Sequence, residues 1–318
     1  MESFYISSRE VIEAIRKKTI SLLSEIQDSQ IKEILIQRAR YSSFVKGVLS
    51  YHIHDGLGGN FNVSEKIDFS SKLEIFCSSG AVLDNVTDGH EERNGRTTYL
   101  KEYGPTVQLF ASQYALNYGL KSLFPFLSTF CRKFPDAYKL DQTIIGMLKM
   151  DTGKSTCLED HIEMISSVNG LFNEVILAMA ASTATEEEDK VKSAGNYGFN
   201  LGVGLGVYEE LRDLLGEHGR RRATEVEKGR VITPMHLAKD FNYLPYIGRP
   251  LSEEEYKTLV HELEKRNALE MTRKLVKKYF EMAIKNLESV VDTTCIKKVI
   301  PLQQSIENSM DIMLSKSS

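Results

Sequence analysis

Apolar residues recur at helical rather than strand spacing along nearly every long segment of this chain, and this periodicity most limits its possible folds. Residues 254–288 are dense in good helix formers and closely spaced charges. Within residues 9–26 one helical stripe consists of Val11, Ile12, Ile15, Leu22, Leu23 and Ile26. No convincing alternation of apolar and polar residues is found. The sequence therefore predicts an all-α protein of about ten or more helices.

The breaks between these helices are short and contain no long Gly/Ser-rich or Pro-rich linker. Ser252 is expected to cap the helix that follows it, with Glu255 completing a capping box. The chain has 318 residues, of which 42% are apolar, so it is long enough to bury a substantial core. We expect one helical domain over residues 1–318.

Composition excludes several classes of protein. The formal net charge of −4 argues against a generally basic nucleic-acid-binding surface. The four cysteines are widely spaced without a CxxC pair, which argues against a disulfide framework or a zinc site. No window approaches 18 uninterrupted apolar residues, so we expect no transmembrane segment. The first 23 residues favour an ordinary first helix over an amphipathic targeting helix, and they lack a signal peptide's apolar run. A cytoplasmic location is expected.

Two acidic clusters lie far apart in the sequence. The first contains Asp84 and Asp88, and the second contains Glu209, Glu210 and Asp213. In both, the outer acids are four residues apart and share one helix face. Two carboxylates in the same space repel each other unless solvent screens them or a cation bridges them, and Mg²⁺ prefers oxygen ligands. A solvated charged face is the alternative for either cluster alone.

The context of both clusters favours an anion site. Each follows an apolar or small-residue run and precedes basic residues. These are Arg93 and Arg96 after the first cluster and Arg220, Arg221, Arg222, Lys228 and Arg230 after the second. Carboxylates, Mg²⁺ and basic side chains together can hold a diphosphate and neutralise its charge as it leaves. The Gly-rich stretch over residues 195–206 favours a closely packed helix over a nucleotide-binding loop.

Four motifs follow one another in a characteristic order: Leu-Gly-Gly at residues 57–59, the aspartate-rich segment 73–98, Lys154-Ser155, and the acidic and basic segment 198–234. Together they resemble the trans-isoprenyl diphosphate synthases, or polyprenyl synthetases, of the class I isoprenoid synthase superfamily. The resemblance extends from about residue 35 to the C-terminal helix. It implies a helical bundle around a central cavity and a homodimer.

The resemblance also implies roles for individual residues. A cluster of three Mg²⁺ ions is expected to be held by Asp84, Asp88, Glu209 and Asp213, which are also the expected catalytic residues. The diphosphate is expected to be bound by Arg93, Lys154 and Arg230. Asn85 replaces the family's second aspartate, but it points about 100° away around the helix, so the outer pair can still bridge metal.

The family's site for its acceptor, isopentenyl diphosphate, is altered. Ser43 falls where the family has a lysine, Cys77 where it has a histidine, and Asn94 where it has the second arginine of RRG. Lys46 stands in place of an arginine and cannot form that residue's planar fork. Three of the four acceptor positions have therefore lost a cation or hydrogen-bond donor.

These features favour an enzyme that ionises a long allylic prenyl diphosphate and releases diphosphate without the usual acceptor. Its chemistry would resemble that of a terpene synthase, or it would transfer the prenyl group to another acceptor. The first alternative is a chain-elongating polyprenyl diphosphate synthase with a rebuilt acceptor site, in which Arg40 or Lys46 compensates. The second is a non-catalytic subunit of a synthase heterodimer, although a scaffold has no need of the retained carboxylates.

The length of the substrate tail is expected to depend on the residues one turn before Asp84. Ser79 and Gly80 are small and would leave a channel for chains of about fifteen to twenty carbons or longer. Close helix–helix contact is the alternative role of these small residues. Phe76, further along the same helix, is a candidate floor.

Overall fold

The computed structural model describes residues 2–87, 89, 92–93, 96–135, 139–152, 155–216 and 222–317, without the side chains of residues 2–3, 92–93, 96, 150–152 and 316–317. Most of these residues are helical, which confirms the all-α prediction. The α-helices are α1 (Glu2–Ser7), α2 (Arg9–Ser24), α3 (Ser29–Tyr41), α4 (Val45–Gly56), α5 (Val63–Thr87), α6 (Tyr99–Lys133), α7 (Leu140–Thr152), α8 (Leu158–Ile165), α9 (Leu171–Ser182), α10 (Glu188–Leu215), α11 (Thr224–Glu227), α12 (Thr233–Leu237), α13 (Glu253–Lys265), α14 (Ala268–Glu288) and α15 (Thr293–Ser317). The other elements are the π-helical turn η2 (Ser166–Gly170), the 3₁₀ turn η4 (Leu244–Tyr246), and the short antiparallel strands β1 (Glu92–Arg93) and β2 (Arg96–Thr97).

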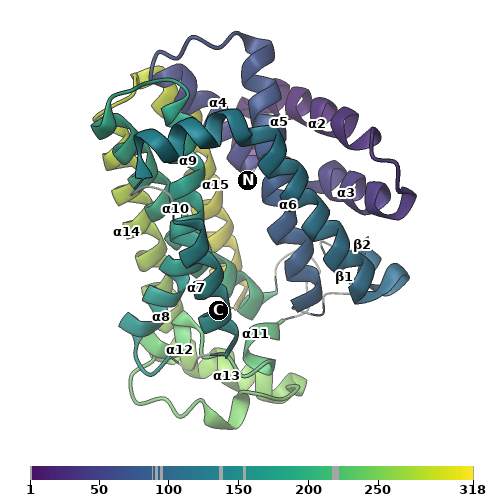
Figure 1. The fold of residues 1–318 in the computed structure, drawn as a ribbon. Coiled ribbons are helices and arrows are strands. Elements are labelled where there is room, and N and C mark those ends of the chain that lie inside the picture. The colour runs from purple at the N-terminus through teal and green to yellow at the C-terminus, as the bar shows by residue number, and fades with distance from the viewer. Residues whose placement is uncertain are drawn as a thin grey trace.

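The long helices form two groups that α4 joins (Figure 1). In one group α5 and α6 pack along each other, and α2 and α3 pack against them. In the other, α10 contacts both α9 and α14, and α15 packs against α14. Helix α4 contacts α5 on one side and α9 on the other. The core is therefore shared between the two groups, with fully buried side chains such as Ile15, Leu49, Leu73, Val203 and Phe280.

Local sequence explains where several helices begin, bend and end. Ser252 accepts a hydrogen bond from the Glu255 backbone N–H, and the Glu255 side chain accepts one from the Ser252 N–H, which confirms the predicted capping box. The helix-forming run over residues 254–288 is interrupted at Asn267, whose left-handed backbone (φ 60°) separates α13 from α14. Gly104, with φ 75°, kinks α6 immediately before Pro105.

Helices α8, η2 and α9 form one continuous apolar stretch, Leu158–Ser182. By length and composition it could cross a membrane, with a mean hydropathy of 1.4 over an 18-residue window. More than half of that window, 56%, is buried inside the protein, as in the core helix of a globular protein. It is the one such candidate found among the described residues.

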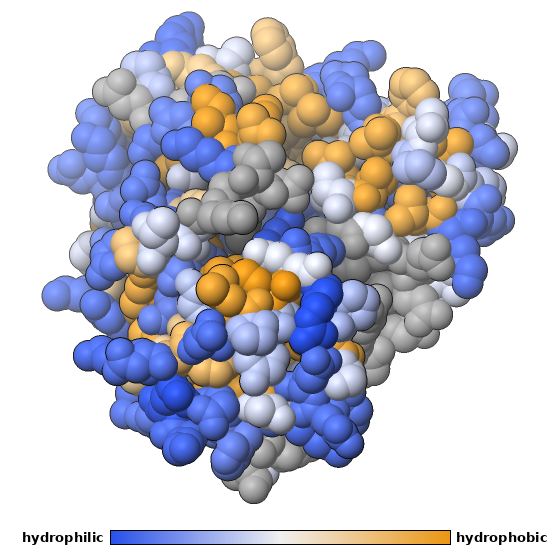
Figure 2. All heavy atoms as spheres, turned by 90° about the horizontal axis from the view of Figure 1, so that it is seen from below, coloured by the Kyte–Doolittle hydropathy of each residue, from blue (hydrophilic) through white to orange (hydrophobic). Residues whose placement is uncertain are grey.

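Helices α5 and α10 bring the two acidic clusters to the same end of the molecule. Both helices run downward in Figure 1, so that their C-terminal ends lie in its lower half. Figure 2 views the molecule from that end, where hydrophilic side chains form much of the outer surface and apolar side chains gather between them. The candidate site is built from these helix ends.

Candidate active site

The first acidic cluster lies in the last turn of α5. Asp84 is half-buried there. Its expected partner Asp88 lies outside the described residues, as does Lys154. Arg93 belongs to β1, but its side chain also lies outside the described part of the structure. Of the acids and cations expected around this cluster, the structure therefore places the side chain of Asp84 alone.

The second acidic cluster depends on glycines that let α10 approach its neighbours closely. A Cβ atom on Gly198 would lie 2.3 Å from the Asn173 backbone oxygen, and one on Gly202 would lie 2.1 Å from the Asn169 oxygen. At Gly206 the nearest atom would be Ile165 Cγ2 at 2.5 Å. The stretch over residues 195–206 is thus a helix packed through its small residues, as predicted, and it sets the position of the acids that follow.

The three acids of α10 have three different environments. Glu209 is half-exposed and pairs with Arg212 at 2.8 Å. Glu210 is buried and accepts hydrogen bonds from the Thr233 backbone N–H at 2.9 Å and the Thr233 hydroxyl at 2.6 Å. The Glu210 side chain therefore ties α10 to the start of α12, whereas Glu209 and Asp213 are the acids of this cluster that the resemblance assigns to metal.

Asp213 is held at the start of α11. Its carboxylate accepts a hydrogen bond from the Glu225 backbone N–H at 3.0 Å and another from the Thr224 hydroxyl. Burial raises the pKa of Asp213 to about 6, although these hydrogen bonds act in the opposite direction. The ionised form is thus disfavoured, and a nearby cation would stabilise it. We refer to Asp84 of α5 and Glu209 and Asp213 of α10, which the resemblance assigns to one metal site, as the donor cluster.

Two histidines that sequence analysis did not assign a role extend the Glu210 contacts. His161 Nε2 lies 2.8 Å from Glu210 Oε1. The Ser155 hydroxyl lies 2.8 Å from His236 Nε2 and 3.4 Å from His161 Nδ1. Burial and the neighbouring His161 lower the pKa of His236 to about 4, so this ring is neutral at neutral pH. No sequence spacing indicates this network, because the fold brings its members together from three separate segments, 155–161, 210 and 233–236.

Arg230, expected to bind diphosphate, forms an ion pair with Glu225. Lys228 Nζ lies 3.4 Å from the same carboxylate. Glu225 stands where the resembled family has an aspartate. Its charge therefore holds both basic side chains near α11, and whether Arg230 turns to a diphosphate stays a prediction.

Three of the family's four acceptor positions, Ser43, Lys46 and Cys77, are near a buried acid that sequence analysis missed, whereas Asn94 lies outside the described residues. Glu74 accepts a hydrogen bond from the Gly47 backbone N–H at 2.6 Å. Burial raises the pKa of Glu74, and the positive charges of Lys46 and Arg38 oppose this rise. Cys77, one turn further along α5, also has a pKa raised by burial, to about 12, so its thiol stays protonated. We refer to Ser43, Lys46, Glu74 and Cys77 as the acceptor cluster.

The loop that carries Ser43 has an unusual backbone. Phe44, buried at the start of α4, has a left-handed conformation with φ 53°. Such a conformation costs free energy in a non-glycine residue and is concentrated at functional positions. The Arg16 guanidinium lies 5.4 Å from the centre of the Phe44 ring. This contact brings a cation from α2 to the acceptor cluster.

The two clusters share helix α5. Cys77 precedes Asp84 by seven residues, about two helical turns or 10 Å. Arg212, which pairs with Glu209 in the donor cluster, also acts electrostatically on Tyr5, as Glu74 of the acceptor cluster does. A molecule bound at one cluster would therefore be within reach of the other.

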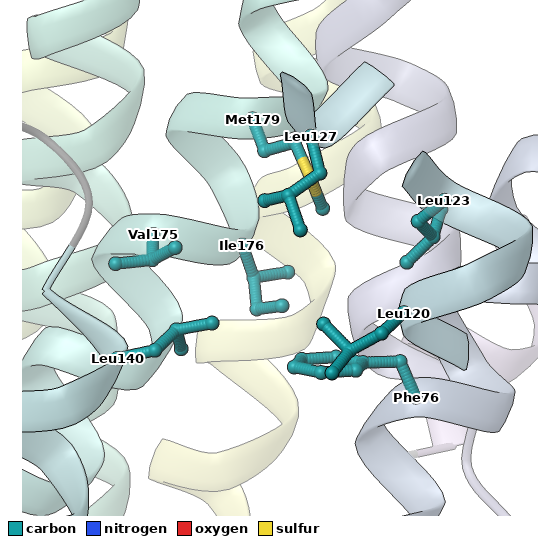
Figure 3. Close-up of a pocket in the computed structure, with 8 residues that line it drawn as sticks. All are labelled: Phe76, Leu120, Leu123, Leu127, Leu140, Val175, Ile176 and Met179. Atoms are coloured by element: carbon teal, nitrogen blue, oxygen red, sulfur yellow. The ribbon is translucent and has the colours of Figure 1, made fainter. Parts of the chain in front are cut away.

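A small apolar cavity lies beside the part of α5 that precedes Asp84. Figure 3 shows its lining side chains pointing toward one another: Phe76, Leu120, Leu123, Leu127, Leu140, Val175, Ile176 and Met179. The Phe76 ring stacks on Phe172, with 6.1 Å between ring centres, and a Cβ on Gly119 would lie 2.6 Å from Phe76 Cβ. These contacts with Phe172 and Gly119 fix the Phe76 side chain, which lies between Asp84 and the inner part of the cavity.

The predicted channel residues lie between Phe76 and Asp84. A Cβ atom added to Gly80 would meet nothing within 4 Å, so there is open space beside it. The Ser79 hydroxyl donates to the Phe76 backbone oxygen, and the Ser79 backbone oxygen accepts a hydrogen bond from Ser112 of α6 at 2.8 Å. This turn of α5 therefore takes part in helix–helix contact, and the tail channel beside Gly80 stays a prediction.

Metal binding rests on oxygen donors alone. Within the described ranges, no group of three or more His, Cys, Asp or Glu side chains is placed to hold a metal ion. Asp88, which would complete the first pair, lies outside them. The donor cluster supplies only carboxylates, which suit Mg²⁺, and the pKa of one of them is raised by burial. The chemistry of these side chains fits Mg²⁺.

Comparison with known proteins agrees with the resemblance seen in the sequence. No family model matches the chain. Geranylgeranyl diphosphate synthase of Saccharolobus solfataricus is 23% identical over 257 residues, which cover 74% of this chain and 76% of the relative. Heptaprenyl diphosphate synthase component 2 of Bacillus subtilis is 20% identical over 250 residues, covering 74% of this chain and 70% of the relative.

The fold matches as well. The crystal structure of polyprenyl synthase from Caulobacter crescentus, complexed with calcium and isoprenyl diphosphate, superimposes with a TM-score of 0.82 at 13% identity. The match covers 96% of this chain and 97% of that one. This chain is therefore a homologue of the trans-prenyl diphosphate synthases and has the fold of the polyprenyl synthetase family.

Proposed function

We propose that this protein is a Mg²⁺-dependent prenyltransferase that elongates an allylic prenyl diphosphate of about fifteen to twenty carbons. The donor cluster would bind and ionise the allylic diphosphate, and the acceptor cluster would hold isopentenyl diphosphate. The observation that carries this proposal is the set of cations around the acceptor cluster. Lys46 belongs to the cluster, Arg38 of α3 acts electrostatically on Glu74, and the Arg16 guanidinium of α2 lies over Phe44, the residue after Ser43. The family's own acceptor residues are nevertheless mostly replaced.

Asp84, Glu209 and Asp213, together with Asp88, would hold the Mg²⁺ ions, and three ions are expected by resemblance. When bound, the ions would supply positive charge to the departing diphosphate. The chain's own contribution is to fix these carboxylates at two helix ends and to place basic residues beside them. The allylic carbon–oxygen bond would break with its electron pair leaving on the diphosphate. A carbon–carbon bond to the acceptor double bond would then form, and a proton would be lost.

A second candidate function is ionisation without isopentenyl diphosphate, as in a terpene synthase. Ser43 and the protonated Cys77 favour it, because neither supplies the positive charge of the family's lysine or histidine. In that case the allylic cation would cyclise, lose a proton or react with water or another acceptor. The donor cluster has the same role in both candidates, so only the acceptor cluster distinguishes them.

One assay separates the candidates. Pure protein would be incubated with Mg²⁺ and farnesyl or geranylgeranyl diphosphate, with and without isopentenyl diphosphate. Elongated products that require isopentenyl diphosphate would support the proposal, and diphosphate release without it would support the second candidate. A sample with EDTA serves as the blank. If neither product rises above this blank, the chain would be a subunit that needs a partner. The name of the Bacillus subtilis relative, component 2, makes that outcome worth testing.

We also propose that the protein is a cytoplasmic homodimer built through α6 and α7. Six large apolar side chains on these helices are at least 45% exposed: Leu109, Phe110, Phe124, Ile144, Ile145 and Leu148. Exposed apolar groups of this number commonly mark a protein interface. Light scattering after size exclusion should give twice the 36.0 kDa chain mass, and Phe110→Glu should shift the mass toward one chain. A wild-type monomer would contradict this proposal.

A further inference from the structure

The continuous stretch of α8, η2 and α9 meets α10 once in every turn. Three of these meetings use a glycine of α10, where an added Cβ atom would lie 2.1–2.5 Å from the facing segment. At the fourth, a glutamate of α10 meets a histidine of α8 instead. The four contacts are Asn173–Gly198, Asn169–Gly202, Ile165–Gly206 and His161–Glu210. Because one number falls by four as the other rises by four, the two segments run antiparallel, and we refer to this line of contacts as the seam.

The last contact of the seam is polar and buried. Glu210 Oε1 lies 2.8 Å from His161 Nε2, while Oε2 accepts hydrogen bonds from the N–H and the hydroxyl of Thr233. A carboxylate can only accept, so the imidazole donates through Nε2, and its Nδ1 lies 3.4 Å from the Ser155 hydroxyl. Both oxygens of Glu210 are thus engaged by segments other than α10. This side chain therefore fixes α10 against α8 and α12 together.

Burial of Glu210 in the seam sets the rotation of α10 about its own axis. Adjacent residues of a helix point about 100° apart, so Glu209 points about 100° away from the seam. Asp213, three residues after Glu210, points about 60° away on the same side. The exposed fractions agree, since the Glu209 side chain is 50% exposed and that of Glu210 only 9%. Glu209 and Asp213 therefore share one direction because Glu210 occupies the other.

The carboxylates of α10 also hold the segment that contains Arg230. Asp213 accepts hydrogen bonds from the Glu225 N–H and the Thr224 hydroxyl at the start of α11. Glu210 accepts from Thr233 at the start of α12. Arg230 lies between these two attachments. Figure 1 shows α8, α11 and α12 in the lower half of the molecule, where α10 ends.

We propose that His161 and Glu210 act together as positioning residues for the diphosphate site. Their contact fixes the rotation of α10 and the start of α12, and so directs Glu209 and Asp213 toward the Mg²⁺ ions and Arg230 toward the diphosphate. Neither His161 nor Glu210 touches the ligand in this role. The inference rests on the proposed function, because that function identifies the ligand as a Mg²⁺-bound diphosphate. It applies to both candidate functions, in which the donor cluster has the same role.

Binding of inorganic pyrophosphate to the full chain tests this inference. Calorimetry would be performed with Mg²⁺ and again in EDTA, so that the difference isolates the binding that needs the metal. His161→Leu removes both ring nitrogens and should weaken Mg²⁺-dependent binding about tenfold. His161→Gln keeps an N–H donor for Glu210 and should stay within about threefold of wild type.

Steady-state kinetics separate positioning from a general loss of structure. His161→Leu should lower kcat/KM for the allylic diphosphate about tenfold to hundredfold, because small displacements of the groups that hold a substrate cost rate. The KM for isopentenyl diphosphate should not change, because the acceptor cluster belongs to other segments. His54→Leu is the matched control. His54 is also buried, and its ring nitrogens have no hydrogen-bond partner among the described residues, so this variant should leave binding and kinetics unchanged.

The outcomes distinguish this inference from the proposed function. Weaker pyrophosphate binding by His161→Leu, with recovery in His161→Gln but no prenyl transfer by wild type, would support the positioning role and overturn the proposed function. Prenyl transfer with unchanged binding in folded His161→Leu would overturn the positioning role alone. Equal weakening in His161→Leu and His161→Gln, or in His54→Leu, would also overturn it.

A second variant keeps the inference testable if His161→Leu does not fold, as judged by circular dichroism. Thr233→Val keeps the backbone N–H that donates to Glu210 and loses only the hydroxyl. It should weaken Mg²⁺-dependent pyrophosphate binding about threefold. Unchanged binding in folded Thr233→Val would count against the positioning role.

Discussion

The donor cluster and the acceptor cluster differ in how their carboxylates meet solvent. Asp84 is half-buried and Glu209 is half-exposed. Both lie near the ends of their helices, where ions from solution can reach them. Glu74 in the acceptor cluster is buried and already satisfied by the Gly47 N–H and the charge of Lys46. The comparison shows that the acids of the donor cluster lie near helix ends, with Glu209 paired to Arg212, whereas the acid of the acceptor cluster is buried among cations.

The largest effect is expected when a carboxylate of the donor cluster is removed. Asp84→Ala should lower Mg²⁺-dependent diphosphate release by about 100-fold or more, because charge stabilisation in the transition state is commonly worth that much. Asn85→Ala, on the adjacent position pointing elsewhere, is the control and should be mild. Release would be measured by a coupled pyrophosphate assay. Full activity in a folded Asp84→Ala protein would remove the metal assignment.

The next prediction concerns the stability of the acceptor side. Glu74→Ala should lower the free energy of unfolding by about 2–4 kcal/mol, because the Gly47 N–H loses its acceptor and the neighbouring cations lose their counter-charge. Glu74→Gln keeps an oxygen acceptor and should cost about 1 kcal/mol. Urea unfolding would give both values. Equal losses in the two variants would show that the hydrogen bond is not what matters.

A smaller effect should separate the two clusters in catalysis. Lys46→Ala should raise the KM for isopentenyl diphosphate about tenfold, as expected for loss of one charged contact to a phosphate. The KM for the allylic diphosphate should stay the same, because Lys46 belongs to the acceptor cluster. Initial rates with each substrate varied in turn would measure both constants. A rise in the allylic KM alone would reverse the assignment of the two clusters.

Asp213 offers a test through pH. Its folded pKa of about 6 lies above the ordinary value of about 4, so the folded state binds this proton more tightly. The stabilisation from its protonated form is complete below pH 4 and is lost as the pH rises to 6. Asp213→Asn should therefore gain about 2–3 kcal/mol relative to wild type between pH 4 and pH 7. Parallel stability profiles of the two proteins would contradict this.

The smallest expected effect concerns tail length. Ser79→Phe should shift preference toward shorter allylic diphosphates about threefold to tenfold, because the ring would fill the space near Gly80. Ser79→Ala keeps the small volume and should leave the preference unchanged. Competition between farnesyl and geranylgeranyl diphosphate would measure the shift. An unaltered preference in folded Ser79→Phe would show that the tail follows another path, such as one ending before Phe76.

Much of the fold was predictable from local patterns. Helical periodicity indicated the class, and the Ser252 capping box and the tightly packed Gly-rich α10 were predicted from residues close in sequence. The resemblance to the prenyl synthases was also confirmed by homologues and by the fold. The roles of the donor residues remain predictions, since Asp88, Lys154 and the side chain of Arg93 lie outside the described residues.

The sequence by itself determined that this chain forms helices and carries two acid pairs, because both depend on spacing within one helix. Only the tertiary structure decided which of the acids on α10 is buried. It placed Glu210 against Thr233 and His161, while Glu209 one residue before it stays half-exposed. It also placed the Gly47 N–H against Glu74. Adjacent residues on a helix point about 100° apart, and distant segments meet only through packing, so no local pattern contains these contacts.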